Sequence, residues 1–286
     1  MRATTAILLS ATASTLALPA LAADYDPPIF VEEVAAAPWV PVEIGSGWYL
    51  RGDVTYTAAT RTADPFAFRT YDAVGDTYAS DSFDSASLNE DFSFGGGVGY
   101  HFTDLFRMDA TLDYGRLRFG GENETAAPCP DPFGGPVDTG CRTEASGEAS
   151  VWSGLLNAYV DLGTVSGFTP YVGAGAGYSY LSWDAIRNQA YCVDGVAACA
   201  DPAYLGETSH PGESDWRFTW AVMAGVAWDA TQNIKVDLGY RYRRIEGGDM
   251  FGFNSTDTAA GATGVQGRDS ALSQHQVRVG LRYSLW

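Results

Sequence analysis

Beyond its N-terminal segment, the sequence lacks any run of about 18 apolar residues, the length that a membrane-spanning helix needs. Charged residues are also scarce, at 18% of the chain, and 17 lysines and arginines stand against 35 aspartates and glutamates. The first absence excludes a helical membrane protein. The excess of negative charge argues against a nucleic-acid partner, because such partners are polyanions.

Residues that commonly carry chemistry are few as well. There are three histidines, the cysteines have neither zinc-ribbon nor CxxC spacing, and no acidic run has EF-hand spacing. No glycine-rich stretch follows a strand and opens a helix, so the 33 glycines form no nucleotide-binding motif. The sequence therefore predicts no enzyme, no cofactor and no metal site. His275 and Ser273 lie two residues apart and leave a lipid-modifying enzyme as an alternative.

The N-terminal segment has the features of an export signal. Arg2 precedes an apolar run, Ala6–Leu18, and small residues follow up to Ala22. This pattern predicts a signal peptide over residues 1–22 that is cleaved after Ala22. Residues 23–47 are rich in proline and acidic side chains, which predicts an extended periplasmic leader. The remaining domain is residues 48–286.

What the sequence has in abundance is the alternation of apolar with small or polar residues. In the stretch Asp215–Tyr242 every second residue is apolar, from Trp216 to Trp228 and again from Ile234 to Tyr242. A period of two is typical of β-strands, because successive side chains leave a strand on opposite faces. The stretch is therefore predicted to be a two-stranded hairpin with one apolar face.

The same alternation predicts six further strands, and long and short connections follow one another in turn. These strands are Trp48–Tyr56, Phe92–Phe102, Phe106–Tyr114, Val151–Leu162, Pro170–Leu181 and Gln276–Leu285, and the long connections are residues 57–91, 115–150, 182–214 and 243–270. Strands of this length, in even number and with this rhythm of connections, are typical of outer-membrane barrels. The predicted fold is all-β, an eight-stranded antiparallel up-and-down transmembrane β-barrel with long extracellular loops.

Two of the long connections each contain a close pair of cysteines. In an exported chain such pairs indicate disulfides, since the compartment is oxidising. The predicted bonds join Cys129 to Cys141 and Cys192 to Cys199 within their loops.

The polar phase of the strands is predicted to face the lumen. The apolar phase holds too many large side chains to fit inside eight strands, which excludes a soluble lipocalin-like cup. Each Arg or Lys facing lipid would also cost about 2–4 kcal/mol near the bilayer midplane. The predicted lumen network consists of Arg51, Asp53, Arg107, Asp109, Asp113, Asp161, Arg217, Lys235, Asp237, Arg241, Arg278 and Arg282. The predicted lipid-facing aromatic residues include Trp48, Trp152, Trp216, Trp220, Trp228 and Tyr240.

The predicted lumen network bears on conduction. Its positive and negative groups nearly neutralise one another, and unpaired charge would be costly in a narrow interior. A paired network fills the lumen rather than opening it. A small porin that conducts small solutes through an arginine-lined constriction is the alternative.

Three motifs resemble the alphaproteobacterial outer-membrane β-barrel, or opacity-type porin-like, family. They are Gly47-Trp48-Tyr49-Leu50-Arg51-Gly52-Asp53-Val54, Pro170-Tyr171-Val172-Gly173-Ala174-Gly175 and Val277-Arg278-Val279-Gly280-Leu281-Arg282-Tyr283. Members usually end in an aromatic residue in phase with the lipid-facing set, whereas here Leu285 holds that phase and Trp286 does not.

The resemblance implies a monomer in the cell outer membrane with a structural, envelope-integrity or surface-interaction role. The implied partners are outer-membrane lipids and lipopolysaccharide, the barrel-assembly machinery and an extracellular or host ligand.

Overall fold

The structure is a computed structural model that describes residues 47–62, 66–129, 133–201 and 203–285. The predicted signal peptide (1–22), the leader as far as residue 46, and Trp286 lie outside the described residues. Within the described part of the chain, no helix is long and apolar enough to cross a membrane.

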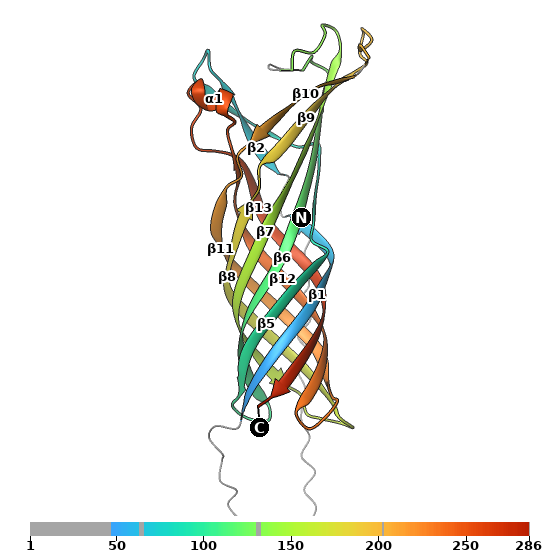
Figure 1. Cartoon of the computed structure of the whole chain (residues 1–286), viewed down its shortest axis with the longest axis vertical. Coiled ribbons are helices and arrows are strands. Elements are labelled where there is room, and N and C mark those ends of the chain that lie inside the picture. Colours follow the sequence, from blue (N-terminus) through green and yellow to red (C-terminus); the bar gives the residue numbers. More distant parts are fainter. Residues whose placement is uncertain (1–46, 63–65, 130–132, 202, 286) are drawn as a thin grey trace, which may run out of the picture. The chain divides into compact units, whose positions relative to one another are not determined.

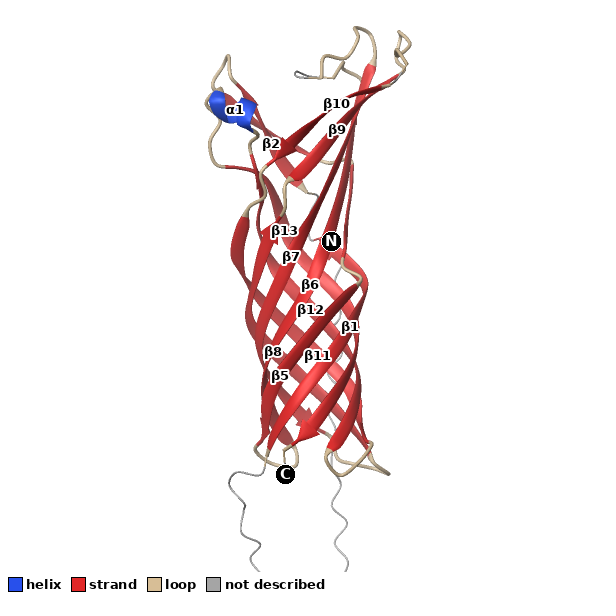
Figure 2. Cartoon of the chain, in the orientation of Figure 1, coloured by secondary structure: helices blue, strands red, loops and turns tan. Residues whose placement is uncertain are grey.

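Eight antiparallel strands close into a ring in the order β7-β8-β11-β12-β13-β1-β5-β6, and β6 pairs with β7 to complete it (Figures 1 and 2). Their bounds are β1 Trp48–Thr62, β5 Phe92–His101, β6 Phe106–Thr125, β7 Gly140–Asp161, β8 Phe168–Trp183, β11 Ser214–Asp229, β12 Ile234–Gly252 and β13 Val265–Ser284. Each predicted strand overlaps one of these eight. The predicted eight-stranded antiparallel barrel is therefore confirmed.

The long connections hold more regular structure than the sequence analysis predicted. Residues 57–91 were predicted to be a long connection, yet they contain part of β1 and three further strands. The extra elements are β2 Ala67–Asp72, β3 Thr77–Ser82, β4 Ser85–Asn89, β9 Ile186–Val193, β10 Tyr204–His210 and the one-turn helix α1 Ser255–Ala259. The strands β6 and β7 also run on together from Phe106↔Val160 to Thr125↔Cys141. We call this continuation of the wall, with β2, β3, β4, β9, β10 and α1, the extension.

The polarity of the wall inverts where the barrel passes into the extension. On β6 the outward residues change from apolar to charged between Tyr114 and Arg116, and the inward residues become apolar at Leu117. On β12 the same exchange separates outward Tyr242 from Arg244, while inward Arg243 gives way to Ile245 (a buried residue). An outer surface in lipid must be apolar, and one in water is polar around an apolar core. The inversion therefore marks the outer boundary of the membrane.

Inside the extension lies a hydrophobic core that the sequence analysis did not predict. It consists of Phe66, Leu88, Leu117, Phe119, Ala145, Ala149, Val151, Leu181, Trp183, Ile186, Ile245, Met250, Phe251 and Leu272, with Phe68 and Phe83 packed against it. Most of these residues fall in the stretches taken as loops. The extension is thus a folded body with its own core.

Candidate functional site

Aromatic side chains encircle the lipid-facing wall. Tyr114, Trp152, Tyr180 and Trp216 are register partners across four adjacent strands, and together form a row at the outer boundary. The predicted lipid-facing residues Trp48, Trp152, Trp216, Trp228 and Tyr240 are all exposed at 45% or more, and Trp220 is partly covered by the ring of Tyr242 at 5.5 Å. Aromatic girdles of this kind are typical of both membrane interfaces.

The buried ionic groups of the described residues balance in number. They are seven arginines and seven carboxylates: Arg51, Arg107, Arg217, Arg241, Arg243, Arg278 and Arg282, with Asp53, Glu90, Asp109, Asp113, Asp161, Asp237 and Asp269. Burying a charge is tolerated only when it is paired and hydrogen-bonded. The equal numbers allow the interior to contain this many ions without a net charge.

Asp109, near the start of β6, is the acceptor at the centre of a hydrogen-bonded cluster in the lumen. Its carboxylate accepts hydrogen bonds from Arg51 Nη1 at 2.6 Å, from Tyr49 Oη at 3.0 Å and from Asn157 Nδ2 at 2.8 Å. Arg51 also donates two bonds of 2.8 Å to the carboxylate of Asp53. Charge-assisted, bidentate pairs of this type are the strongest hydrogen bonds that side chains make.

Glycine on β5 makes room for this cluster. A Cβ atom at Gly99 would lie 2.2 Å from the ring of Tyr49, a separation that real Cβ atoms do not reach. Because β5 lies between β1 and β6, small residues on it let Tyr49 and Arg51 of β1 reach Asp109 of β6. The packing therefore requires a glycine at position 99.

Several bonds span the lumen from one wall to the other. Strands β6 and β12 stand opposite each other in the ring, and Arg241 Nη1 donates to Asp113 Oδ2 at 2.7 Å. In the same way Arg278 on β13 reaches Tyr159 Oη on β7 at 3.4 Å. Tyr159, Leu155, Tyr171, Ala221 and Met223 form an apolar cluster beside these bonds. Side chains thus cross the full width of the interior.

Eleven of the twelve predicted lumen residues are buried, and Lys235 is the exception. Lys235 pairs with Asp229, and the two side chains are 28% and 33% exposed, so they form a surface pair rather than part of the network. Lys235 is in the inward phase, as the register partner of Arg282, and lies next to a short turn where that phase opens to solvent.

Sequence reasoning missed three buried charges. Arg243 Nη2 donates to Glu90 Oε2 at 2.8 Å, and Arg217 Nη1 donates to Asp269 Oδ2 at 2.5 Å. Arg243, Glu90 and Asp269 fell in stretches taken as loops. Arg243 continues the inward phase of Asp237 and Arg241, so an extended alternation could have identified it.

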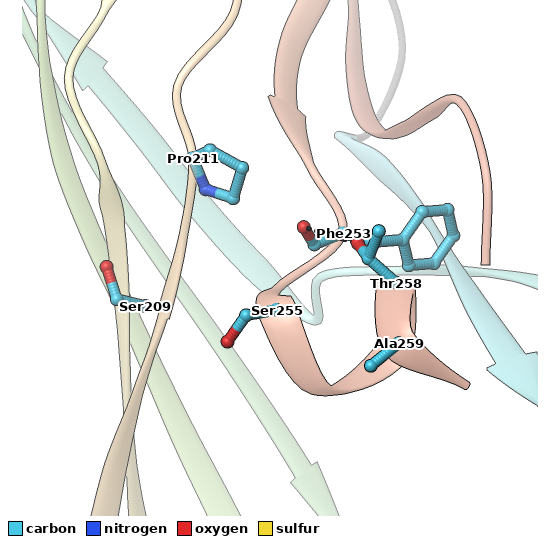
Figure 3. A pocket seen from close by; sticks show the side chains of 6 residues that line it. All are labelled: Ser209, Pro211, Phe253, Ser255, Thr258 and Ala259. Carbon is cyan, nitrogen blue, oxygen red and sulfur yellow. Dashed lines mark hydrogen bonds between the residues drawn. The ribbon is translucent and has the colours of Figure 1, made fainter. Parts of the chain in front are cut away.

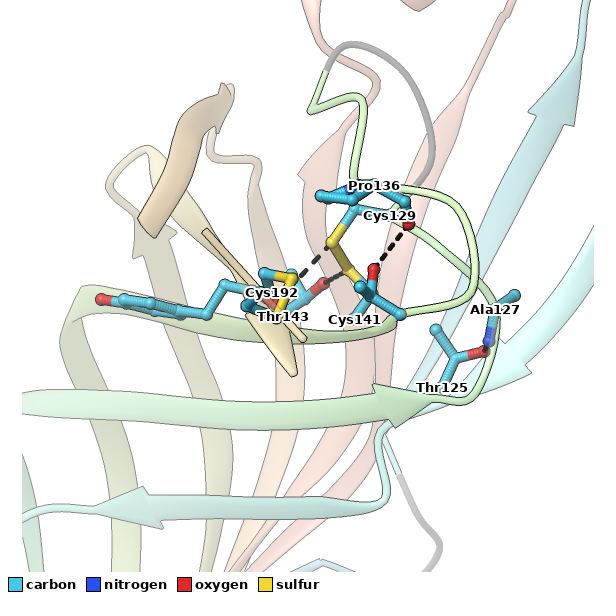
Figure 4. The surroundings of a disulfide bond; sticks show 10 residues. Thr125, Ala127, Cys129, Pro136, Cys141, Thr143 and Cys192 are labelled. Atoms are coloured by element: carbon cyan, nitrogen blue, oxygen red, sulfur yellow. Dashed lines mark hydrogen bonds between the residues drawn. A yellow bond between two sulfur atoms is a disulfide. The ribbon is translucent and has the colours of Figure 1, made fainter. Parts of the chain in front are cut away.

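The extension carries both disulfides. The Cys129–Cys141 and Cys192–Cys199 bonds are present, with Cα–Cα distances of 4.8 Å and 5.8 Å. Cys141 and Cys192 are also register partners between β7 and β9, which brings the two bonds side by side (Figure 4). Each bond closes the end of its own hairpin, and the pairing of β7 with β9 holds the two ends together.

An open hollow of about 650 Å³ lies between the end of β10 and the segment that leads into α1. Its lining is Ser209, Pro211, Phe253, Ser255, Thr258 and Ala259 (Figure 3). Apolar surface with a few hydroxyl groups is typical of ligand-binding hollows. Beside it Tyr71 and Tyr78 stack with ring centroids 5.0 Å apart, and the Arg69 guanidinium lies over the ring of Phe253 at 5.4 Å.

The predicted His–Ser pair faces outward but is not assembled as a catalytic pair. His275 Nδ1 is 2.6 Å from Tyr240 Oη, while Ser273 Oγ accepts a hydrogen bond of 3.1 Å from Tyr242 Oη. Each side chain thus has a tyrosine of β12 as its partner. In the described part of the chain, no three His, Cys, Asp or Glu side chains are grouped so as to hold a metal ion.

Comparison with known proteins shows the family of the chain. Residues 8–284 match the model of the outer membrane protein beta-barrel domain. An uncharacterized protein of Brucella abortus is 38% identical over 269 residues, which cover 89% of this chain and 90% of that protein. A Rickettsia felis protein, named as a candidate adhesin, is 23% identical over 244 residues, or 85% and 90% of the two chains. Among solved structures, Neisserial surface protein A is similar with a TM-score of 0.39 and 18% identity, covering 84% of this chain and 98% of that one. The chain belongs to the outer-membrane β-barrel domain family and is an integral protein of the outer membrane.

Proposed function

We propose that this protein is a surface-interaction protein in which a closed barrel anchors a folded extracellular extension that contacts a ligand. The observation that supports this best is the core of the extension, because a buried apolar cluster and two disulfides hold its exposed surface in one shape. The naming of the Rickettsia relative as an adhesin candidate is consistent with the proposal.

The barrel itself acts as an anchor and does not conduct. Arg241 with Asp113, and Arg278 with Tyr159, bridge opposite walls, and eight strands enclose only enough space for side chains. Planar-bilayer recording of the refolded protein is expected to show no steady unitary current. A steady current that disappears in Arg51→Ala or Arg282→Ala would instead establish a pore through the lumen.

The ligand-contact surface includes the hollow between Ser209 and Ser255. Adhesion of cells that display the protein to a host-cell monolayer is the test, with surface level measured by antibody. Ser255→Tyr fills the hollow and is expected to lower adhesion at least fivefold.

A second groove provides the matched control, and Ser87 of β4 lines it. Ser87→Tyr adds the same side chain to the same extension and is expected to leave adhesion unchanged. Equal adhesion of cells with and without the protein would refute the proposed function. Equal loss in both variants would place the contact elsewhere in the extension.

A further inference from the structure

On three strands of the ring, an arginine is the first charged residue on the outward face beyond the apolar part of the wall. On β6 it is Arg116, two residues beyond Tyr114, and on β12 it is Arg244, two residues beyond Tyr242. On β1 it is Arg61, which is exposed. Each of these arginines therefore lies at the level where the wall leaves the apolar part of the membrane.

Farther from the membrane, carboxylates outnumber guanidinium groups among the exposed charges. The exposed acidic residues there include Asp72, Asp76, Asp81, Asp84, Glu122, Glu124, Asp138, Asp194, Asp201 and Glu207. Arg116 has the carboxylates of Glu148 and Asp184 nearby, whereas Arg61 and Arg244 lie on the two sides of β13.

Two of the boundary arginines face one point on the wall. Ser273 of β13 is the register partner of Arg61 on β1 and also of Arg244 on β12. Neighbouring strands lie about 4.8 Å apart, so the two arginine Cα atoms are roughly 10 Å apart with the serine between them. Long side chains from both sides can converge on a group that lies over Ser273.

The surroundings leave hydrogen-bonding capacity at this point. Arg61 has no ion pair with any residue that the structure describes. Arg244 Nε is 3.4 Å from Glu246 Oε1, and both side chains are partly exposed. Ser273 Oγ accepts from Tyr242 and retains its own hydroxyl hydrogen as a donor. The next outward residue towards the membrane is His275.

We propose that Arg61, Arg244 and Ser273 bind a phosphate group of a lipid headgroup in the outer leaflet. The guanidinium fork matches phosphate oxygens and binds them in pairs, which an ammonium group does not. The apolar wall directly below, with Tyr240 and Val277, covers the acyl chains of the same lipid. This continuity with the lipid-facing wall identifies the source of the phosphate as a membrane lipid rather than a soluble ligand. The site is separate from the ligand surface of the proposed function.

The test is calorimetric titration of the refolded full chain in detergent micelles with lipopolysaccharide, and with lipopolysaccharide from which the lipid phosphates have been removed. The double variant Arg61→Gln/Arg244→Gln is expected to bind intact lipopolysaccharide at least tenfold more weakly than the unmodified chain. Removal of the phosphates is expected to weaken binding to the unmodified chain by a similar factor.

A matched control is available within the extension. Arg187 is exposed and stands between two serines in register, Ser146 and Ser209, while Arg268 is exposed and paired with Asp249. The control variant Arg187→Gln/Arg268→Gln also removes two positive charges, but far from the boundary. It is expected to leave the affinity for lipopolysaccharide unchanged.

Four outcomes would overturn the proposal. Two concern the variants: equal affinity of the boundary variant and the unmodified chain, and equal loss in the control variant. The third is equal affinity of the unmodified chain for the two lipids. The fourth is competition by inorganic phosphate at millimolar concentration, which would indicate a site for free anions. The comparison of the two lipids uses only the unmodified chain, so it decides the question even where a variant fails to refold.

Discussion

The lumen within the membrane contains paired charged side chains, whereas the interior of the extension contains apolar ones. Inside the membrane, Arg241 and Asp113 meet across the barrel, whereas a few residues farther along the same strands Ile245 and Leu117 pack into an apolar cluster. The backbone is continuous through both, and β6, β7, β12 and β13 run through the boundary without interruption. The change of interior therefore follows from the solvent outside the wall and not from a change of fold.

The two interiors also depend on different forces. In lipid the hydrophobic residues are needed on the outer wall, so the interior must be polar and is held by directed pairs of charges. In water the hydrophobic residues are needed in the interior, and burial of their apolar surface stabilises the extension. Damage to one half should therefore have consequences different in kind from damage to the other.

The largest effect is expected from breaking the charged half at its centre. Asp109→Ala leaves Arg51 buried without one of its carboxylates, and removal of one partner of a buried pair costs about 3–5 kcal/mol. Urea unfolding in lipid vesicles measures this loss. Arg142→Ala is the control, because the Arg142–Glu144 pair is 41% and 44% exposed and is expected to contribute less than about 1 kcal/mol. Similar losses in both variants would contradict the importance of burial.

A smaller and more local effect is expected in the apolar half. Ile186 is fully buried in the core of the extension, and Ile→Ala in a core costs about 2–5 kcal/mol. Because β9 belongs to the extension, Ile186→Ala should make the extension more sensitive to limited proteolysis. The urea midpoint of the barrel should not change. Val196→Ala, at a position that is 97% exposed, is the control. Loss of the barrel together with the extension would show that the two halves unfold as one unit.

The loss of stability on removal of a disulfide should be smaller still and confined to the extension. Cys129→Ser/Cys141→Ser opens a link between residues 12 apart, and links of this size typically contribute about 2–4 kcal/mol. The expected result is faster proteolysis of the extension with an unchanged urea midpoint of the barrel. A reducing agent also opens the Cys192–Cys199 bond, so the reduced unmodified chain should be digested at least as fast as the variant.

The smallest effect concerns pH. Burial lowers the pKa of the His210 imidazole from its ordinary value, and the ring packs on Phe251 at 5.8 Å. The unfolded chain then binds more protons than the folded one below about pH 6.5, so the stability of the extension falls as the pH is lowered, by at most about 1.4 kcal/mol per pH unit. Proteolysis between pH 7.5 and pH 5 measures the effect. His210→Gln should remove the pH dependence, and an unchanged dependence would assign it to other groups.

Much of the barrel could be predicted from the alternation alone. The stretch Asp215–Tyr242 alternates without a break on either side of its turn, and β11 and β12 are found there. The lumen charges followed from the same phase, because a side chain on a strand faces one side or the other. Lys235 has the inward phase but lies beside a turn and is partly exposed, because alternation carries no information about how deep in the wall a residue lies.

The extension could not be predicted in this way. Strands β2, β3 and β4 are short, and the alternation around Leu88 has too few periods to be recognised. Leu88 is buried only because β4 pairs with β6, which places it opposite Phe119. Pairing between segments far apart in the chain is not recorded in the local pattern of either segment.

The sequence by itself determined the closed barrel, its apolar outer wall and its charged interior, because a strand in lipid must place apolar and polar residues on alternate sides. Only the tertiary structure decided which charges meet, as Arg241 finds Asp113 across the full width of the ring. It alone also decided that the loops fold into a body with a core, and that Arg61 and Arg244 flank the same serine. These features depend on the register between strands, which the folded sheet sets once all of its strands are paired.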